Sequence, residues 1–280
     1  MERPTLEVRN GLKGWAKRRL PLPIWIAGRM VLATIQPYRR FDSSAYWRSR
    51  AACPGQQAVM WGERFTQLVR ERQELAIRPF IEALPAQARV LDIGCGIGVL
   101  ARMMTRLRDD IDIDAVDFEE MIQVARTYPD QPRIHYFCES AEKYSVGERV
   151  YDLILSAGCY SSIQDIDHLH QALINAFRMA ADLGTILLVD PIHRWKYLAR
   201  ARISPSAIIR LARDHGFRLT RRSGMIFWPF RDWLIESNME DELLRRRFAL
   251  GEILLSVFGT RYWSDYKILV FQRDSPGEIS

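Results

Sequence analysis

The chain has 280 residues, of which 48% are hydrophobic and 26% charged, and this ordinary globular composition excludes a disordered or fibrous protein. Its formal net charge is +6. Four cysteines without a Cys-x-x-Cys pair exclude a disulfide scaffold, argue against structural zinc, and indicate a reducing, cytoplasmic setting.

The positive charge is concentrated at the N-terminus. Residues 1–60 contain eleven Lys and Arg and three acids, a net of 11 − 3 = +8, so the remaining residues carry 6 − 8 = −2. An apolar stretch from Leu20 to Ile35 is too short to span a bilayer and is interrupted by Arg29. Two interpretations stay open for residues 13–35. They form an interfacial helix on an anionic membrane surface, which would make the protein peripheral at the inner face of a membrane, or they form a helix packed on the domain.

Alternating strands and helices follow this arm. A short helix with Ser43 or Ser44 as its cap is expected first, then an amphipathic helix over 61–83. Strands are expected at 90–93, 113–117, 134–138, 151–157 and 186–189, and helices at 99–107, 119–127 and 165–181. A helix opening at Ser204-Pro205, a strand at 217–220, a helical segment at 232–257 and a last strand at 267–271 complete the chain.

This β-α rhythm, with strands apolar on both faces, predicts a parallel sheet covered by helices. No linker divides residues 61–280. We therefore expect one α/β domain over 61–280, preceded by a basic arm over 1–60.

A glycine-rich turn, Asp92-Ile93-Gly94-Cys95-Gly96-Ile97-Gly98, joins the first strand to the first helix. Glycines there let the backbone approach a ligand, since no Cβ intervenes. The spacing does not fit a dinucleotide fingerprint, because Val99 stands where its third glycine belongs, and no Gly-Lys-Ser/Thr follows for a phosphate loop. An acid before the first glycine suits a ligand that carries an ammonium group.

A second acid, Asp117, ends the second strand 25 residues after Asp92. In nucleoside-binding α/β sheets an acid at this place accepts hydrogen bonds from ribose hydroxyls. Together, the loop and Asp117 indicate a nucleoside ligand with a cationic end.

These motifs resemble those of the class I, Rossmann-like methyltransferases that use S-adenosylmethionine. The resemblance rests on Val90–Gly98, Ala115–Phe118, Glu139–Glu142 and Tyr151–Gly158, and covers residues 85–220. It implies a seven-stranded, mostly parallel sheet with helices on both faces and an antiparallel last strand, with a helical insert before that strand. It places the cofactor contacts at Asp92, Gly94, Cys95, Gly96, Asp117, Phe118, Ser140, Ala141 and Ser156. Ser140 replaces the acid that often caps the adenine amine in this family.

The loops after the fourth and fifth strands are expected to face the reacting group, since ligands in this fold sit at the carboxyl ends of the strands. Tyr160 follows the fourth strand and is a candidate catalytic residue. His193 follows the fifth, and is the first candidate for a general base because histidine titrates near neutrality. The alternative for His193 is a solvent-facing loop residue. No metal is expected.

Three further segments allow two interpretations each. Tyr46 and Arg50 form a cofactor lid, with Arg50 on the methionine carboxylate, or the aromatic pair Tyr46–Trp47 anchors the arm to the core. The aromatic segment 227–230 lines an acceptor pocket or packs in the core. Arg245–Arg247 follow Glu240–Glu242 at helical spacing, which predicts a solvated, ion-paired face.

The sequence thus predicts a methyltransferase that acts on an oxygen or nitrogen of a small-molecule acceptor, with lipid- and glycan-linked intermediates among the candidates. Two alternatives remain: an RNA methyltransferase that uses the basic arm as a clamp, and a non-catalytic, cofactor-binding partner subunit. The arm holds few stacking aromatics, which disfavours RNA.

Overall fold

A computed structural model describes residues 24, 27–28, 31, 43–53, 55, 63–129, 131–147, 150–193, 202–235 and 239–273. The chain divides into two compact units, one of residues 1–39 with 195–198, the other of residues 40–194 with 199–280. Most of the first unit, and with it most of the predicted interfacial segment, lies outside the described residues. The sections below concern the second unit.

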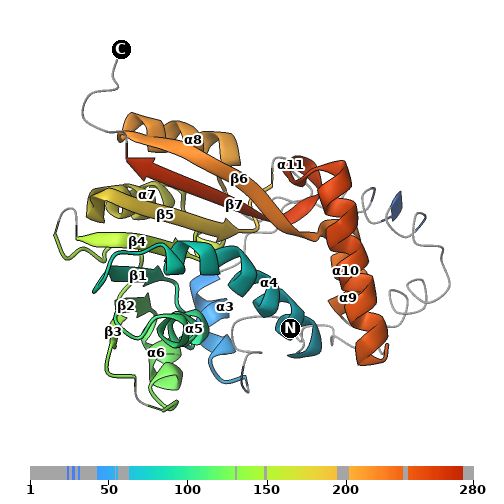
Figure 1. Ribbon diagram of the computed structural model, residues 1–280, viewed down its shortest axis with the longest axis horizontal. Coiled ribbons are helices and arrows are strands. Elements are labelled where there is room, and N and C mark those ends of the chain that lie inside the picture. Colours follow the sequence, from blue (N-terminus) through green and yellow to red (C-terminus); the bar gives the residue numbers. More distant parts are fainter. Residues whose placement is uncertain are drawn as a thin grey trace, which may run out of the picture. The chain divides into compact units, whose positions relative to one another are not determined.

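A seven-stranded sheet forms the centre of the second unit (Figure 1). Its strands are β1 (Arg89–Ile93), β2 (Asp112–Asp117), β3 (Ile134–Cys138), β4 (Tyr151–Ser156), β5 (Ala180–Asp190), β6 (Phe217–Phe227) and β7 (Ser264–Arg273), in the order β3-β2-β1-β4-β5-β7-β6. Strands β1 to β5 pair in parallel, whereas β7 is antiparallel to both β5 and β6. The predicted mostly parallel sheet with an antiparallel last strand is confirmed.

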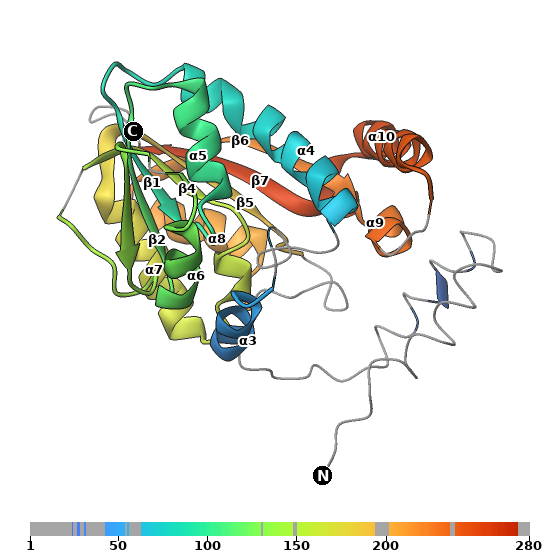
Figure 2. The ribbon, with the colours of Figure 1, turned by 90° about the horizontal axis from the view of Figure 1, so that it is seen from below.

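Helices cover both faces of this sheet. They are α3 (Ser43–Arg50), α4 (Glu63–Glu82), α5 (Val99–Leu107), α6 (Glu119–Ala125), α7 (Ile166–Met179), α8 (Pro205–Asp214), α9 (Trp228–Ile235), α10 (Asp241–Phe258) and α11 (Thr260–Trp263). Helices α4 and α5 lie on one face and α7 and α8 on the other (Figures 1 and 2). Side-chain caps fix the N-termini of two helices. The Asp165 carboxylate accepts from two backbone amides at the start of α7, and the Ser204 hydroxyl, just before α8, accepts from the amide of Ala207 within α8.

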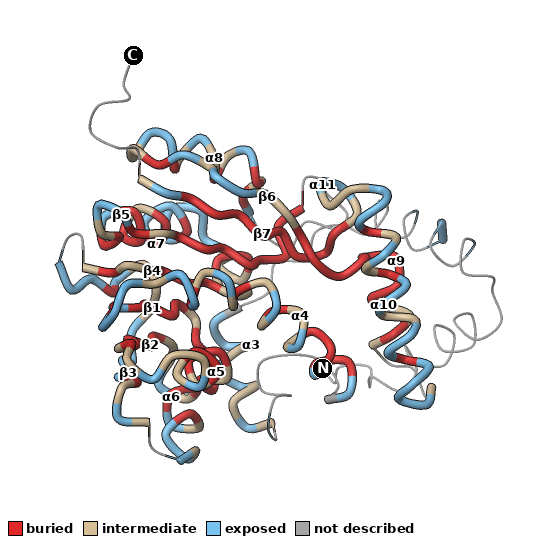
Figure 3. The backbone as a smooth tube through the Cα atoms, in the orientation of Figure 1, coloured by how far each residue is buried: buried red, intermediate tan, exposed pale blue. Residues whose placement is uncertain are grey.

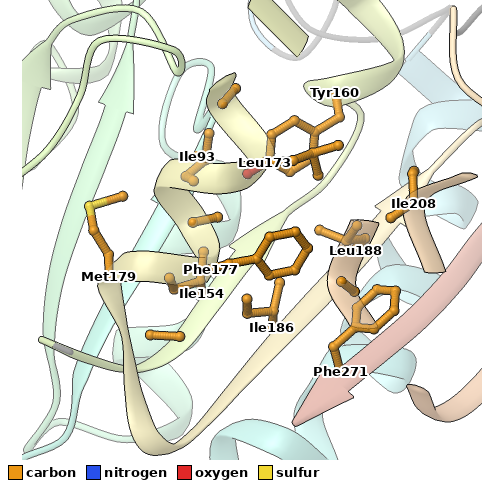
Figure 4. Packing of buried hydrophobic residues seen from close by; sticks show 14 of the residues in the cluster. Ile93, Ile154, Tyr160, Leu173, Phe177, Met179, Ile186, Leu188, Ile208 and Phe271 are labelled. Carbon is orange, nitrogen blue, oxygen red and sulfur yellow. The ribbon is translucent and has the colours of Figure 1, made fainter. Parts of the chain in front are cut away.

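The core lies between the central strands and the α7–α8 layer. Phe177 of α7 packs against Phe217 and Phe271, with ring centroids 5.1 and 6.4 Å away. Figure 4 shows Phe177 and Phe271 within this core, and Figure 3 shows burial concentrated along the inner strands. Because the strands carry apolar side chains on both faces, each face requires such a helical layer. The layers leave the carboxyl ends of β1, β2, β4 and β5 at one edge of the sheet.

Two expected elements near the C-terminus were wrong in extent. The strand expected at 217–220 continues to Phe227, because β7 pairs with it over its length and an edge strand tolerates the polar run at Arg221–Gly224. The helical segment expected at 232–257 is two helices, α9 and α10, which begin at Trp228 and Asp241.

Candidate functional site

The glycine-rich turn after β1 has the backbone that only glycine adopts without strain. Gly94, Gly96 and Gly98 have φ values of +73°, +57° and +74°. A Cβ on Gly94 would lie 2.4 Å from Cys159 Cβ, and one on Gly98 would lie 2.5 Å from Tyr136 Oη. The loop therefore packs tightly against the segment after β4 and against β3, with no room for side chains.

Asp92 is a fully buried carboxylate inside β1, and neither of its oxygens has a hydrogen-bond partner. Burial raises the pKa of Asp92 to about 7, although the positive charge of Arg70 opposes the shift. An unpaired buried carboxylate is costly and calls for a cationic partner. An ammonium group is the kind of ligand cation that would meet this need, and the contact between Asp92 and such a group stays a prediction of the sequence.

Arg70 of α4 is a site residue that the sequence analysis missed. Its charge acts on Asp92 and on Tyr266, its Nε is buried with no partner, and burial lowers its pKa to about 10. Asp92 and Arg70 together offer one anion and one cation, the complement of a zwitterionic amino acid. In the sequence, Arg70 is one of several arginines and glutamates among the apolar residues of the amphipathic helix, and only the folded chain brings its charge near Asp92.

Asp117 fixes the turn at the end of β2. Its Oδ2 accepts from Gly96 N at 2.7 Å and its Oδ1 from Phe118 N at 2.7 Å. Burial raises the pKa of Asp117 to about 6, against the lowering effect of these two bonds. Each oxygen keeps a lone pair, so Asp117 holds the loop and still offers acceptors to ribose hydroxyls.

Ser140 and Ala141 lie close to Asp117, since Glu139 N donates to Asp117 O at 3.2 Å. The backbone amide and the hydroxyl of Ser140 both donate to Glu139 Oε1, at 2.9 and 3.4 Å. Ala141 packs against the core. The structure therefore gathers the predicted residues after β1, β2 and β3 around one loop.

The residues after β4 are tied together by Asp190, at the end of β5. Ser156 Oγ donates to Asp190 Oδ2 at 3.2 Å and Ser161 N donates to Asp190 Oδ1 at 3.0 Å. All three residues are buried, so the Ser156 hydroxyl is committed to Asp190.

Burial raises the pKa of the Cys95 and Cys159 thiols, which keeps them protonated and weak as nucleophiles.

Tyr160 is a core side chain. Its ring lies among Ile93, Leu173 and Leu188 in the cluster under α7 (Figure 4), and it has no exposed surface. Its buried hydroxyl has no partner, and burial raises its pKa. This position favours a packing role over the predicted catalytic one.

His193 lies in a buried polar cluster beyond the end of β5. Its Nε2 is 3.0 Å from Asp265 Oδ1, which also accepts from Arg231 Nη1 at 2.6 Å. The interpretation of His193 as a solvent-facing residue is wrong, because it is buried. Burial lowers the pKa of His193. Burial by itself would raise the pKa of Asp265, but the charge of Arg231 and the hydrogen bond with His193 hold that pKa well below its usual range.

These shifts define the protonation of the pair. An ionised Asp265 only accepts hydrogen bonds, so Nε2 of His193 carries the ring proton and Nδ1 is the basic nitrogen. Asp265 and Arg231 were not found from the sequence, because 72 and 38 residues separate them from His193.

The cluster lies at the carboxyl edge that carries the loop. Asp190 of β5 pairs with Lys267 of β7, so Asp265 comes two residues earlier in β7, beside the chain that leaves β5. Lys267 Nζ donates to Ser264 O at 2.6 Å, and burial lowers its pKa to about 8. Tyr266, next to Asp265, interacts with Arg70, which links the cluster to Asp92.

Helix α3 is docked beside the loop through Trp47 and Arg48. Trp47 packs against Ile97 and Met121, and Arg48 pairs with Glu120 at 3.3 Å and lies 4.8 Å above the Phe118 ring. Tyr46 and Arg50 contact each other at 6.0 Å, and Tyr46 is 45% exposed. The helix is anchored as one interpretation expected, and the predicted lid contacts of Tyr46 and Arg50 stay predictions.

The aromatic segment at the start of α9 packs inward. Phe227, Trp228 and Phe230 are buried, and the Trp228 ring stacks on Trp263 at 6.0 Å. This arrangement favours core packing.

Among the described side chains, no group of His, Cys, Asp or Glu is placed to hold a metal ion. None of the helices described is long and apolar enough to cross a membrane.

The sheet order, the glycine turn and the acids Asp92 and Asp117 define the class I, Rossmann-like methyltransferases, whose cofactor is S-adenosylmethionine. The family model described as "Methyltransferase domain" matches residues 60–223. The chain belongs to that family.

Individual relatives match less of the chain. A malonyl-[acyl-carrier protein] O-methyltransferase from Bacillus cereus is 33% identical over 103 residues, which are 36% of this chain and 37% of that protein. A ubiquinone biosynthesis O-methyltransferase from Nitrobacter winogradskyi is 28% identical over 192 residues, 59% of this chain and 70% of that protein. The first of these matches spans about a third of the relative's length.

A solved structure shares the fold over a larger part of the chain. An N-methyltransferase from Bradyrhizobium japonicum in complex with S-adenosyl-L-homocysteine superposes with a TM-score of 0.55 and 13% identity, covering 84% of this chain and all of that chain. This likeness shows the fold alone.

Proposed function

We propose that this protein transfers a methyl group to a hydroxyl oxygen of a small-molecule acceptor, with His193 as the proton acceptor. The observation that carries the proposal is the buried His193–Asp265–Arg231 cluster at the carboxyl edge of the sheet. S-adenosylmethionine, when bound, supplies an already activated methyl group, so the protein has to bind, orient and deprotonate.

The binding residues divide into two sets. Asp92 takes the ammonium group and Arg70 the carboxylate of the amino-acid end, since both carboxylate oxygens of Asp92 and the Nε of Arg70 are buried without a hydrogen-bond partner. Asp117 accepts from the ribose, and the left-handed backbone of Gly94–Gly98 lets the ligand approach closely. Arg70 thus takes the place that the sequence analysis gave to Arg50.

His193 suits the deprotonation of an alcohol or a phenol. Its lowered pKa keeps it neutral at pH 7, and Asp265 holds the tautomer in which Nδ1 is basic. Asp265 also stabilises the imidazolium that forms when Nδ1 takes the proton. A neutral amine acceptor needs no such base, so the cluster favours oxygen over nitrogen. The two curated relatives described above are both O-methyltransferases, which supports the same choice.

The cofactor half is tested by calorimetric titration with S-adenosylmethionine and S-adenosylhomocysteine. Wild-type protein is expected to bind both, and Asp92→Ala and Asp117→Ala to lose binding. Arg70→Gln is expected to weaken binding about tenfold or more, the cost of one charge-assisted hydrogen bond, whereas Arg50→Gln has little effect. Folded wild-type protein that binds neither ligand would refute the proposal.

The transfer half needs an acceptor screen, beginning with small phenols and with lipid and glycan extracts. With an acceptor in hand, His193→Gln is expected to lower kcat by about 10²–10⁴-fold while cofactor affinity stays unchanged. The matched control is His168→Gln, since His168 is exposed on α7. A His193→Gln enzyme with the wild-type rate and pH profile would exclude His193 as the base.

A further inference from the structure

Helix α10 buries one face and exposes an apolar one. Leu244, Gly251 and Leu255 face inward, and a Cβ on Gly251 would lie 3.2 Å from the Phe230 ring. Opposite them, Leu250, Ile253 and Val257 recur at helical spacing, and the last two are 59% and 72% exposed.

The exposed surface continues past the end of the helix. Phe258 is 58% exposed, and Tyr262 of α11 is also exposed, with the Arg261 guanidinium 5.3 Å from its ring. Single exposed apolar residues are normal, but a contiguous stripe over several turns marks an interaction surface. We call Leu250, Ile253, Val257, Phe258 and Tyr262 the α10 stripe.

The charges around the stripe are positive. Residues 243–263 contain four arginines and one acid, a net of 4 − 1 = +3. The single acid, Glu252, is turned inward, where it pairs with Arg72 at 2.7 Å and accepts from Ile226 N at 2.7 Å. Two of the four arginines are neutralised by ion pairs, Arg245 with Glu71 and Arg246 with Glu242. The other two, Arg247 and Arg261, lie over the rings of Trp233 and Tyr262, so the outward surface presents apolar and aromatic side chains beside these two guanidinium groups.

We propose that the α10 stripe docks on an anionic lipid bilayer. Apolar and aromatic side chains flanked by arginines match the interface, where hydrocarbon and lipid phosphate lie within one side-chain length. A symmetric contact between two copies would instead bring Arg247 and Arg261 of both copies together, and among the described residues neither of these arginines has an ion pair.

The smaller unit carries a similar surface. Ile24, Ala27, Gly28 and Val31 are helical and exposed, and their spacing places them on one helical face. They lie within residues 13–35, for which a helix at a membrane interface is one of the two interpretations that the sequence allows. This surface is a separate observation, and it provides a second bilayer contact that can be tested by its own variant.

The test is sedimentation of the full-length chain with vesicles of phosphatidylglycerol and phosphatidylcholine in equal amounts, and with vesicles of phosphatidylcholine alone. Wild-type protein is expected to bind the anionic vesicles more tightly. Val257→Glu is expected to weaken that binding about tenfold or more, because it removes an exposed apolar side chain that the bilayer would bury and adds a charge that the lipid repels.

The matched control is Leu183→Glu. Leu183 is 91% exposed but is isolated at the start of β5, so this variant is expected to bind vesicles like wild type. Cofactor titration and thermal unfolding of both variants verify that they are folded. Val31→Glu measures the contribution of the arm in the same assay.

Equal vesicle binding by wild type and Val257→Glu would overturn the proposal and assign membrane binding to the arm alone. Absence of vesicle binding, together with a dimer that Val257→Glu dissociates in analytical ultracentrifugation, would overturn it in favour of a contact between copies. Vesicle binding requires neither cofactor nor acceptor, so either failure would leave the proposed methyl transfer intact.

Discussion

At the scale of single residues, the site is built from carboxylates with different partners. Asp265 is held ionised by Arg231 and His193, whereas Asp92 is buried without a hydrogen bond. In the first arrangement Asp265 Oδ1 accepts both hydrogen bonds, while its Oδ2 is buried without a partner. In the second, the charge of Arg70 acts on Asp92 but neither carboxylate oxygen is hydrogen-bonded, which is why we propose Asp92 as the partner of a ligand ammonium group.

Cofactor affinity is expected to depend on pH through Asp92. The pKa of Asp92 is raised to about 7, and an ammonium ligand binds its ionised form. Affinity should therefore rise with pH and level off above about 7, and at pH 6 it should be about tenfold below this plateau. Calorimetry in buffers of different ionisation enthalpy should detect proton release on binding.

The raised pKa of Asp92 has the opposite effect on the folding stability of the free protein, which falls as the pH rises whereas cofactor affinity increases. A raised carboxyl pKa contributes stability below the unfolded value of 3.8, and this contribution is lost as the pH rises through about 7. Asp92→Asn should remove the pH dependence of stability that Asp92 causes and should bind cofactor weakly at every pH. Affinity that is independent of pH in wild type would contradict this account of Asp92.

Gly94→Ala is expected to be more disruptive than a glycine substitution of equal backbone strain. Gly94 and Gly216 have φ values of +73° and +76°, but only at Gly94 would a Cβ meet another atom, Cys159 Cβ at 2.4 Å. Gly216→Ala should cost about 1–2 kcal/mol of unfolding free energy. Gly94→Ala should cost about 1–3 kcal/mol more from overpacking and should abolish cofactor binding. Urea unfolding of both variants measures the difference, and equal costs would show that the loop relaxes around the new methyl group.

At the scale of elements, α10 is attached to α4 by ion pairs of unequal depth. Arg64 pairs with Asp241 and Arg245 with Glu71 near the surface, and Arg72 with Glu252 further in. The predicted solvated face is therefore partly right: Arg246 pairs with Glu242, whereas Arg245 reaches α4 and Arg247 lies over Trp233.

Glu252 is expected to anchor α10, whereas Glu242 is not. Glu252 accepts from the amide of Ile226, a buried β-branched residue with a φ of +64° at the junction of β6 and α9. Glu252→Ala leaves that amide without its partner and should lower the free energy of unfolding by about 2 kcal/mol. Glu242→Ala removes an exposed pair and should cost less than about 0.5 kcal/mol. Chemical denaturation of both variants gives the comparison, and a similar small effect would mean that Ile226 is held by its packing alone.

At the scale of the whole molecule, the net positive charge lies outside the unit that contains the sheet. Residues 1–39 contain eight Lys and Arg and two acids, a net of 8 − 2 = +6, so residues 40–280 carry 6 − 6 = 0. These 39 residues also fall in the smaller compact unit, while α3 falls in the larger one. The positive charge of the chain therefore belongs to a part that the sheet does not include.

Removal of residues 1–39 is expected to leave cofactor affinity and Tm unchanged, since Asp92, Arg70 and Asp117 all lie in the larger unit. Attraction to anionic matrices such as heparin should fall, because the net charge falls from +6 to zero. Titration calorimetry, thermal unfolding and salt elution measure these three quantities. A large drop in Tm would show that the arm packs on the domain and stabilises it.

Local chemistry in the sequence was sufficient for the sheet, most element boundaries and the cofactor loop. Alternating apolar runs, glycines at left-handed positions and an acid beside a strand are each set by near neighbours in the chain. The longer β6 was not found, because its polar residues are tolerated only at an edge paired to β7. Arg70 was not identified from the sequence either, because its charge comes near Asp92 only in the folded chain.

By itself, the sequence determined a methyltransferase fold with Asp92, Asp117 and three glycines around one turn. Only the tertiary structure decided that Tyr160 is a core residue, that Ser156 is committed to Asp190, and that His193 is buried on Asp265. The reason is physical: a left-handed turn or an amphipathic helix is encoded within a few residues. The protonation of a histidine instead depends on burial and on charges that the fold brings together from 72 residues away.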